Sequence, residues 1–402
     1  MARGRGGAGD PSRGRRRHPK PRGNHGIHAA DDDGLPDRIA QDYRRRFGRR
    51  RGTIYFTGSA SKRPRDRHRQ DGFAVRKGEE VRATRVFGLV TLLIVAWLAP
   101  ASATTLLITN TKSDSVSIID TSTLEVVGTI PLGRGKPNRI VFHPDGKQAW
   151  VVFDKSHDLG IVDVEGKKLV KRVKIGGNPY NLTFSPDGRI LYVLDWSSDV
   201  SQDEVIAYDL QAEKIAWRVE VSTWPAHGIF SRDGRLLYVS GETAGDVTII
   251  DTTTHAVVGR VVHGGGDAMG LALTADGKIL YAAAGENKAI LKIDTATNKI
   301  VGEIALPGVV HEATLTLDGK FLYATLRKTN KLVVIRTADD KIATVIPQRA
   351  YPDLVTMEPT GRLALVTNRY ADSVAVIDLA SQAQVRTIPV GKAPHGMALK
   401  PR

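Results

Sequence analysis

The segment NLTFSPDGRILYVLD (residues 181–195) decides the expected fold, because it contains two short strands joined by a tight turn. Its apolar residues alternate up to Phe184 and resume at Ile190, and the dipeptide Asp187-Gly188 between them favours a hairpin. Two further strands, EVIAYD and KIAWRVEV, follow before residue 222. No part of the stretch has the 3.6-residue period of a helix. The sequence therefore predicts a four-stranded antiparallel unit of about 43 residues.

The same unit recurs along the chain. Apolar segments run into HPDG, SPDG, SRDG, TADG, TLDG and EPTG, whose glycines are Gly146, Gly188, Gly234, Gly277, Gly319 and Gly361. A seventh copy, HGMALKP at 395–401, stops before its turn. The first copy begins at a second strand and the last ends with a first strand. We therefore predict an all-β, seven-bladed β-propeller over residues 104–402, with four-stranded antiparallel blades and a ring closed by the C-terminal strand joining three N-terminal strands.

The net charge of +15 is concentrated outside the repeats. Residues 1–80 contain 22 Lys and Arg against 10 Asp and Glu, and they lack the apolar periodicity that a folded core needs. We interpret them as a basic disordered tail, or as a stretch that is not translated because the start lies at Val81. The repeats are nearly neutral, which argues against nucleic acid as a partner of the folded domain.

Residues 81–103 have the parts of an export signal. Arg82 and Arg85 precede the apolar run VFGLVTLLIVAWL, and Ala101-Ser102-Ala103 supplies small residues for cleavage before Thr104. The run at 86–98 is too short to span a bilayer comfortably, so we expect no stable membrane span and a periplasmic or extracellular location; an uncleaved anchor is the alternative. The chain has no Cys, which excludes disulfides, thiolate metal sites and CxxCH haem attachment.

The second strands carry a recurring motif. They contain LITN (107–110), YVLD (192–195), YVS (238–240) and LVTN (365–368), and two repeats end in TIPLG (129–133) and TIPVG (387–391). Together with the SPDG turn, these motifs resemble the YVTN family of β-propeller repeats over essentially all of 104–402. The resemblance implies an exported protein with an architecture similar to lactonase propellers and to the haem-carrying propeller of periplasmic nitrite reductases. A fold of this kind does not define an activity.

A functional site is expected at the mouth of the central channel. In a four-stranded meander, the loops between second and third strands and between blades lie on one face, so the first residues of each innermost strand line that mouth. Alignment on the turn glycines places seven pairs there: Asn138-Arg139, Tyr180-Asn181, Ala226-His227, Met269-Gly270, His311-Glu312, Asp353-Leu354 and His395-Gly396.

Two kinds of ligand fit these residue types. The histidines His227, His311 and His395 come from different blades, and converging imidazoles bind a metal ion or a cofactor propionate. The oxygen donors suit a hard divalent cation such as calcium; they are Asn138, Asn181, Glu312 and Asp353. A divalent cation is therefore the candidate cofactor, and a wet polar channel that holds only water is the alternative.

Two tryptophans are expected beside the mouth. Trp196 opens a longer loop at 196–204, implied by the 46-residue spacing between two turn glycines, and Trp224 lies three residues before His227. Such rings stack a ligand or anchor a protein partner, whereas ordinary blade packing is the alternative. The candidate ligand-binding residues are Asn138, Arg139, Tyr180, Asn181, Trp196, Trp224, His227, His311, Glu312, Asp353 and His395.

The sequence contains no catalytic motif such as GxSxG or HExxH. We therefore expect a non-enzymatic, monomeric, exported propeller that binds a protein or a small molecule at the channel mouth. A metal-assisted, lactonase-like hydrolase at the same mouth is one alternative. An accessory propeller that binds a haem or a quinone is the other.

Overall fold

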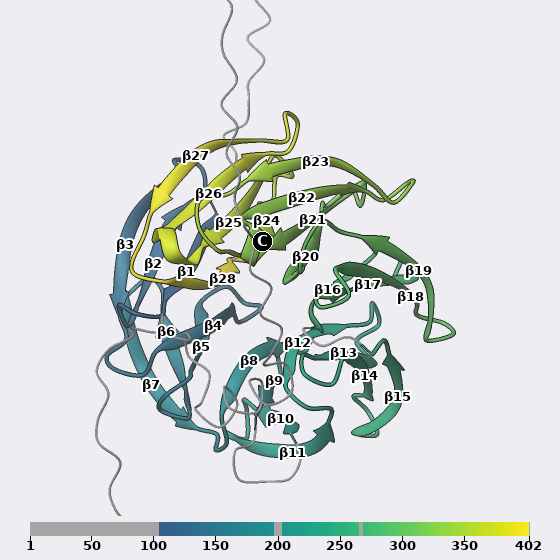
Figure 1. Ribbon diagram of the computed structural model, residues 1–402. Coiled ribbons are helices and arrows are strands. Elements are labelled where there is room, and N and C mark those ends of the chain that lie inside the picture. The colour runs from purple at the N-terminus through teal and green to yellow at the C-terminus, as the bar shows by residue number, and fades with distance from the viewer. Residues whose placement is uncertain (1–103, 197–202, 265–267, 402) are drawn as a thin grey trace, which may run out of the picture. The chain divides into compact units, whose positions relative to one another are not determined.

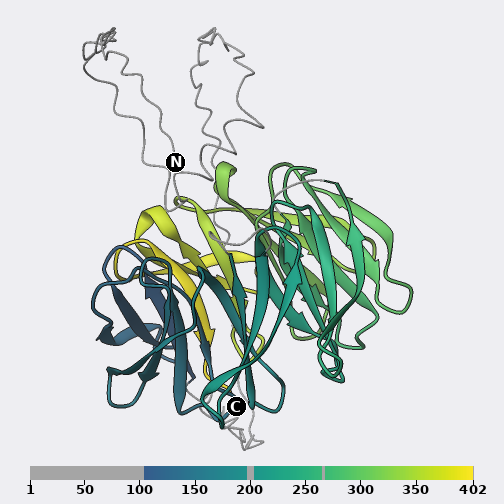
Figure 2. The ribbon, with the colours of Figure 1, turned by 90° about the horizontal axis from the view of Figure 1, so that it is seen from below.

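The computed structural model describes residues 104–196, 203–264 and 268–401. These residues form seven four-stranded antiparallel sheets, so the predicted propeller is confirmed. The sheets stand around a central axis, which Figure 1 shows end-on and Figure 2 shows from the side. The predicted segments 1–80 and 81–103 lie outside the described residues.

Each sheet runs from an innermost strand at the axis to an outermost strand at the edge. The innermost strands are β4 (Pro137–Phe142), β8 (Pro179–Phe184), β12 (Pro225–Phe230), β16 (Ala268–Leu273), β20 (Glu312–Leu315), β24 (Pro352–Met357) and β28 (Pro394–Leu399). The second strands are β1 (Thr105–Asn110), β5 (Gln148–Phe153), β9 (Ile190–Asp195), β13 (Leu236–Gly241), β17 (Ile279–Ala284), β21 (Phe321–Leu326) and β25 (Leu363–Asn368).

The two outer positions are filled in the same order around the ring. The third strands are β2 (Ser115–Asp120), β6 (Asp158–Asp163), β10 (Asp203–Asp209), β14 (Asp246–Asp251), β18 (Ala289–Asp294), β22 (Lys331–Arg336) and β26 (Ser373–Asp378). The outermost strands are β3 (Glu125–Pro131), β7 (Lys168–Lys174), β11 (Lys214–Val221), β15 (Ala256–Val262), β19 (Lys299–Ala305), β23 (Lys341–Pro347) and β27 (Ala383–Pro389). Two short 3₁₀ turns, η1 (Arg327–Thr329) and η2 (Arg369–Ala371), follow β21 and β25.

The ring closes through one sheet shared by both ends of the repeat region. β28 pairs antiparallel with β1, with Leu399 opposite Leu106 and Met397 opposite Ile108, and β1 continues into β2 and β3. The innermost strands contact one another in sequence around the axis, and β28 contacts both β24 and β4. The closure therefore leaves no gap in the ring, as the sequence predicted.

Asp-Gly turns join the innermost strand to the second strand on the face away from the mouth. In these turns only the glycine has a positive φ, as at Gly188 with φ +73°. The preceding Asp187 instead uses its side chain, because Oδ1 accepts hydrogen bonds from Ser185 Oγ at 2.6 Å and Arg189 N at 3.1 Å. Glycine is thus required for the left-handed conformation and aspartate for the hydrogen bonds.

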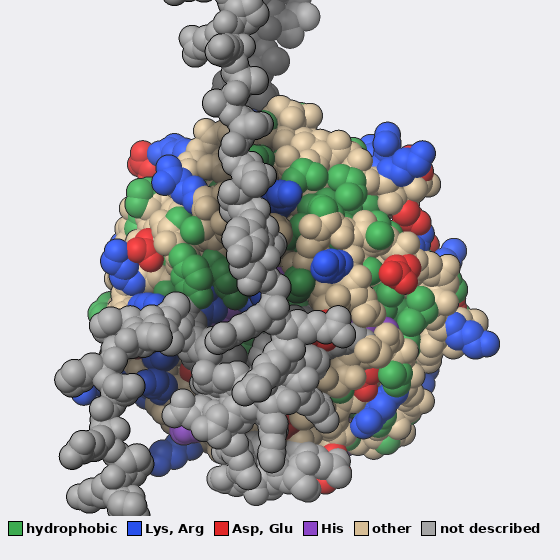
Figure 3. Space-filling view, in the orientation of Figure 1, with side chains coloured by type: hydrophobic (Ala, Val, Ile, Leu, Met, Phe, Trp, Pro, Cys, Tyr) green, Lys and Arg blue, Asp and Glu red, His purple; other side chains and the backbone are tan. Residues whose placement is uncertain are grey.

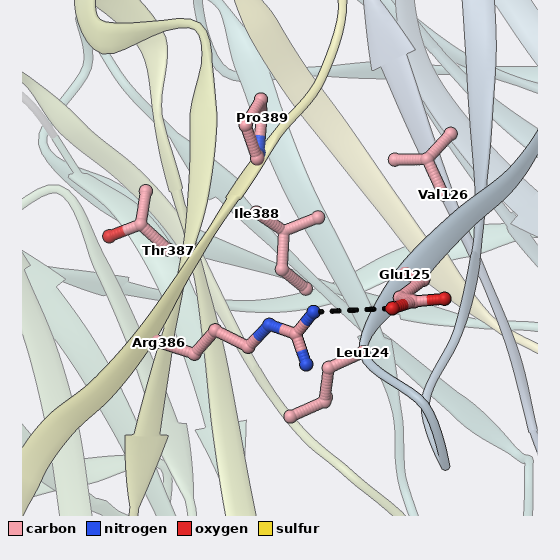
Figure 4. Close-up of a pocket in the computed structure, with 7 residues that line it drawn as sticks. All are labelled: Leu124, Glu125, Val126, Arg386, Thr387, Ile388 and Pro389. Carbon is pink, nitrogen blue, oxygen red and sulfur yellow. Dashed lines mark ion pairs between the residues drawn. The ribbon is translucent and has the colours of Figure 1, made fainter.

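The core consists of seven apolar clusters, one between each pair of neighbouring sheets. The second and third strands are almost wholly buried, whereas the outermost strands alternate between exposed and partly buried residues. Between β27 and β3 lies a surface groove, drawn in Figure 4, which Arg386 crosses to lie 3.6 Å from Glu125. Arg386 also donates to the Thr123 carbonyl at 2.9 Å, so this pair reinforces the closure.

Acidic and basic side chains are interspersed around the edge of the face in Figure 3, without an extended patch of one sign. This distribution agrees with the near-neutral composition of the repeats. Within the described residues, no helix is long and apolar enough to cross a membrane.

Candidate functional site

Hydroxyl side chains of the second strands position the residues of the channel mouth. Thr325 of β21 accepts a hydrogen bond from the backbone N–H of Glu312 in its own sheet, at 3.2 Å. Its hydroxyl donates to the backbone carbonyl of Asp353 in the next sheet, at 2.8 Å. Equivalent donations run from Ser240 to Met269, from Thr367 to His395 and from Thr109 to Asn138. The Thr or Ser of the second strand therefore ties the mouth residue of the next sheet in place in four of the seven sheets.

The mouth is built around the carboxylate of Asp353, which is fully buried on β24. Arg327 at the start of η1 donates to Oδ1 from Nε at 2.8 Å, and Nδ1 of His395 on β28 bonds Oδ2. Nε2 of His311 lies 3.1 Å from Oδ1, and Nη1 of Arg369 lies 3.6 Å from Oδ2. Three neighbouring sheets thus bring two guanidinium groups and two imidazoles to one carboxylate.

These contacts set the charges of the cluster. Burial alone would raise the pKa of Asp353, but the charge of Arg327 and the contacts with both histidines hold it well below its usual range. Burial lowers the pKa of His395 to about 3 and that of His311 well below its ordinary value. At neutral pH the carboxylate is ionised and the imidazoles are neutral. His395 therefore donates its Nδ1 proton to Asp353 and keeps Nε2 unprotonated.

One residue further along the innermost strands, side chains cross the channel. Arg139 of β4 and Glu312 of β20 belong to sheets that are not neighbours in the ring, yet Arg139 Nη2 lies 3.9 Å from Glu312 Oε2. Both side chains are buried. Gly270 makes room for Glu312, because a Cβ there would stand 2.3 Å from Glu312 Oε1. We call Arg139 and Glu312 the crossing pair.

His227 lies beside the crossing pair and not beside the other two histidines. Its Nδ1 accepts a hydrogen bond from the backbone N–H of Leu271 at 3.0 Å and lies 3.5 Å from Glu312 Oε1. Burial lowers the pKa of His227, so the ring is neutral and carries its proton on Nε2. Its side chain is 28% exposed, which leaves part of the ring accessible at the channel.

An aromatic cluster occupies another part of the mouth. Tyr180 of β8 stacks on Trp196 with ring centroids 4.3 Å apart, and Trp196 meets Trp224 edge-on at 4.3 Å. Burial raises the pKa of Tyr180, on which the charges of Arg139 and Arg327 also act. Strand β8, which carries Tyr180, lies next to β4, which carries Arg139. Residues 197–202 of the longer loop predicted at 196–204 lie outside the described residues.

The structure brings six of the predicted residues together in two separate places. His311, Asp353 and His395 meet around one carboxylate, whereas Arg139, Glu312 and His227 meet at the crossing pair. Asn181 donates to the Ala226 carbonyl at 2.6 Å, a contact between neighbouring sheets. Among the described residues, no group of three or more His, Asp or Glu is arranged to hold a metal ion.

Three residues of the mouth were not predicted: Arg327, Arg369 and Asp154. Each directly follows a second strand, at the position that Trp196 holds after β9. Asp154 accepts a hydrogen bond from Asn138 Nδ2 at 2.6 Å, and burial raises its pKa to about 6. An alignment of the residues that follow the second strands would have found all three.

The family is defined by a match over most of the chain. Residues 80–188, 192–348 and 342–400 match the YNCE-like β-propeller family. The chain belongs to this family. No curated protein sequence matches the chain. The YNCE-like family is a β-propeller family of the same general kind as the YVTN repeats, and the narrower YVTN resemblance stays a prediction.

Solved structures similar to this YNCE-like chain include proteins of different activities. The periplasmic gluconolactonase PpgL of Pseudomonas aeruginosa has a TM-score of 0.62 at 18% identity, over 74% of this chain and 99% of its own. Hydrazine synthase of Kuenenia stuttgartiensis has a TM-score of 0.57 at 23% identity, over 66% and 90%. The dihydro-heme d1 dehydrogenase NirN, in complex with DHE, has a TM-score of 0.58 at 18% identity, over 73% and 74%. At these identities the likeness is one of fold alone.

Proposed function

We propose that this YNCE-like propeller is an exported binding protein that holds a small molecule at its channel mouth. The observation that carries the proposal is the crossing pair, because Arg139 and Glu312 reach across the ring and obstruct the channel below the mouth. Above the pair, partly exposed side chains converge from several sheets; Arg327 is 18% exposed and Arg369 16%. A few polar groups next to aromatic rings are typical of ligand sites.

Binding is favoured over catalysis by the state of the Asp353 cluster. Asp353 is bonded to Arg327 and His395 and shielded from solvent, so its carboxylate is not free to attack a substrate. A histidine with a pKa of about 3 is a weak general base at neutral pH, where a pKa near 7 is effective. For a metal-assisted hydrolase, the described residues offer no group of three His, Asp or Glu side chains placed to hold the metal ion.

A haem or quinone ligand is the second candidate, and the aromatic cluster at the mouth favours it. The structurally similar protein NirN is described in complex with DHE. A visible absorption spectrum of the protein purified from its native periplasm tests this candidate: a Soret band would support a bound haem, and a protein without visible absorption would count against it. Location in the periplasm or outside the cell rests on the apolar segment at 86–98 and is part of the proposal.

Tryptophan fluorescence tests the proposed site with a matched pair of variants. A protein-free small-molecule fraction of periplasmic extract should change the emission of the wild type and of Trp217→Phe, and should change that of Trp196→Phe clearly less, because only Trp224 then remains in the aromatic cluster. Trp217 lies on the outermost strand β11 and stacks on His255, away from the mouth, with ring centroids 4.4 Å apart. An equal response in both variants would place the ligand elsewhere.

A further inference from the structure

We infer that the ligand of the mouth carries a carboxylate on a planar ring, and that the carboxylate binds Nε and Nη2 of Arg139. The inference rests on the proposed function and names the chemical class of its ligand. The Arg139 side chain is 9% exposed, and neither Nε nor Nη2 has a hydrogen-bond partner among the described residues. These two atoms form one edge of the guanidinium plane, and their parallel N–H groups match the two oxygens of a carboxylate.

Glu312 balances the charge of Arg139 without satisfying its donors. The 3.9 Å between Nη2 and Oε2 is longer than a hydrogen bond, and Oε1 accepts from the N–H of Ala313 at 3.2 Å. Buried donors without acceptors are costly, so the crossing pair is not a satisfied ion pair. A ligand carboxylate supplies the missing acceptors once Glu312 withdraws from the channel. Glu312 therefore competes with the ligand for Arg139.

The aromatic cluster accounts for the planar ring. Tyr180 and Arg139 come from the contacting innermost strands β8 and β4, near the start of each strand, and Tyr180 stacks on Trp196. A ring attached to the bound carboxylate therefore meets the face or edge of Tyr180 and Trp196. A phosphate dianion would face the negative charges of Glu312 and Asp353 with twice the charge of a carboxylate, so the mouth favours the singly charged group.

Isothermal titration of the full chain with three probes tests the inference. The probes are 2-naphthoate, its uncharged analogue 2-naphthamide, and 2-naphthyl phosphate. We expect the wild type to bind 2-naphthoate about tenfold or more tightly than the amide, which is the usual range of a charge-assisted hydrogen-bonded pair. Arg139→Gln should remove this preference, Arg139→Lys should keep only part of it, and Glu312→Gln should tighten 2-naphthoate binding by removing the competing charge.

The possible results distinguish a wrong ligand class from a wrong binding site. Equal binding of 2-naphthoate and 2-naphthamide, or a preference that persists in Arg139→Gln, would overturn the role of Arg139. Tighter binding of 2-naphthyl phosphate would overturn the carboxylate class, and so would no binding of any probe. None of these results affects the fluorescence comparison of Trp196→Phe and Trp217→Phe, on which the proposed function depends. Should Arg139→Gln fail to fold, Glu312→Gln still decides, because weaker binding in that variant contradicts the competition.

Discussion

At the scale of single residues, the hydroxyl of Thr325 connects fold and site. Thr325→Val keeps the shape of the side chain but leaves the Asp353 carbonyl and the Glu312 N–H without their partner. We expect the free energy of unfolding to fall by about 1–3 kcal/mol. Thr325→Ser retains the hydroxyl and should lose clearly less. Urea unfolding followed by tryptophan fluorescence measures both, and equal losses would mean that the methyl group and not the hydroxyl is responsible.

Asp195 predicts a pH dependence of stability. It is fully buried at the end of β9. Burial, and next the charge of Glu204, raises the pKa of Asp195 to about 7. The folded state therefore holds a proton that the unfolded chain releases near pH 4. Asp195 therefore makes its full contribution to the free energy of unfolding below about pH 4, and this contribution is lost as the pH rises through about 7.

Asn110 and Asn368 occupy the position of Asp195 in two other sheets, so Asp195→Asn restores the residue of the repeat. The variant should be more stable than the wild type at pH 8, and the gain should shrink toward pH 4.5; each unit of raised pKa corresponds to about 1.4 kcal/mol. Urea midpoints at the two pH values measure this. Asp318→Asn is the control, because a hydrogen bond from Thr316 lowers the pKa of Asp318 and its loss should destabilise the protein at pH 8.

Local sequence predicted which residues surround the mouth, but not how they pair. Alignment on the turn glycines placed His311, Asp353 and His395 at equivalent positions, because the spacing within a repeat is nearly constant. The contact between Arg139 and Glu312 depends on the width of the ring and on the small size of Gly270, and neither is visible within one repeat. The place of His227 could be read from the alignment, because His227 shares the second position of its pair with Arg139 and Glu312, whereas His311 and His395 hold the first.

At the scale of elements, β28 is the strand on which the closed ring depends. Deletion of residues 395–402 removes most of β28 and exposes the edge of β1. We expect the melting temperature to fall by about 10 °C or more, because the deletion removes a whole strand pairing and each kcal/mol shifts Tm by about 2–4 °C even in domains of 150–250 residues. Deletion of residues 401–402 is the control and should have little effect. A melting temperature unchanged by the longer deletion would contradict the closure.

The deletion also removes His395 from Asp353, and His395→Asn separates the two effects. This variant keeps the strand and its backbone pairing with β1 but alters the bond to the buried carboxylate. Its melting temperature should lie between those of the wild type and the deletion. The sheet shared by both ends could be predicted from the sequence alone. The first repeat lacks an innermost strand, and the last repeat consists only of one.

At the scale of the whole molecule, the shared sheet can be moved around the ring by circular permutation. Lys400 N donates to Thr105 O at 2.8 Å, so the two ends are close enough to be joined by a copy of the SPDG turn. A permutant opened between Asp187 and Gly188 places the new ends between β8 and β9 and makes that sheet the shared one. A permutant opened between Gly176 and Gly177 has its new ends between β7 and β8, which belong to different sheets. Each of its sheets is then formed by one continuous stretch of chain, and no sheet contains strands from both ends.

We expect both permutants to fold, and the one opened at Asp187 to keep the fluorescence response of the wild type, because that opening lies on the face away from the mouth and leaves the aromatic cluster unchanged. The permutant opened at Asp187 should melt close to the wild type. The one opened at Gly176 should melt at a lower temperature, since no hydrogen-bonded strand pair then holds its first and last sheets together. Calorimetry of the two side by side measures the effect of the shared sheet, and identical melting temperatures would mean that contacts between neighbouring sheets are sufficient to keep the ring closed.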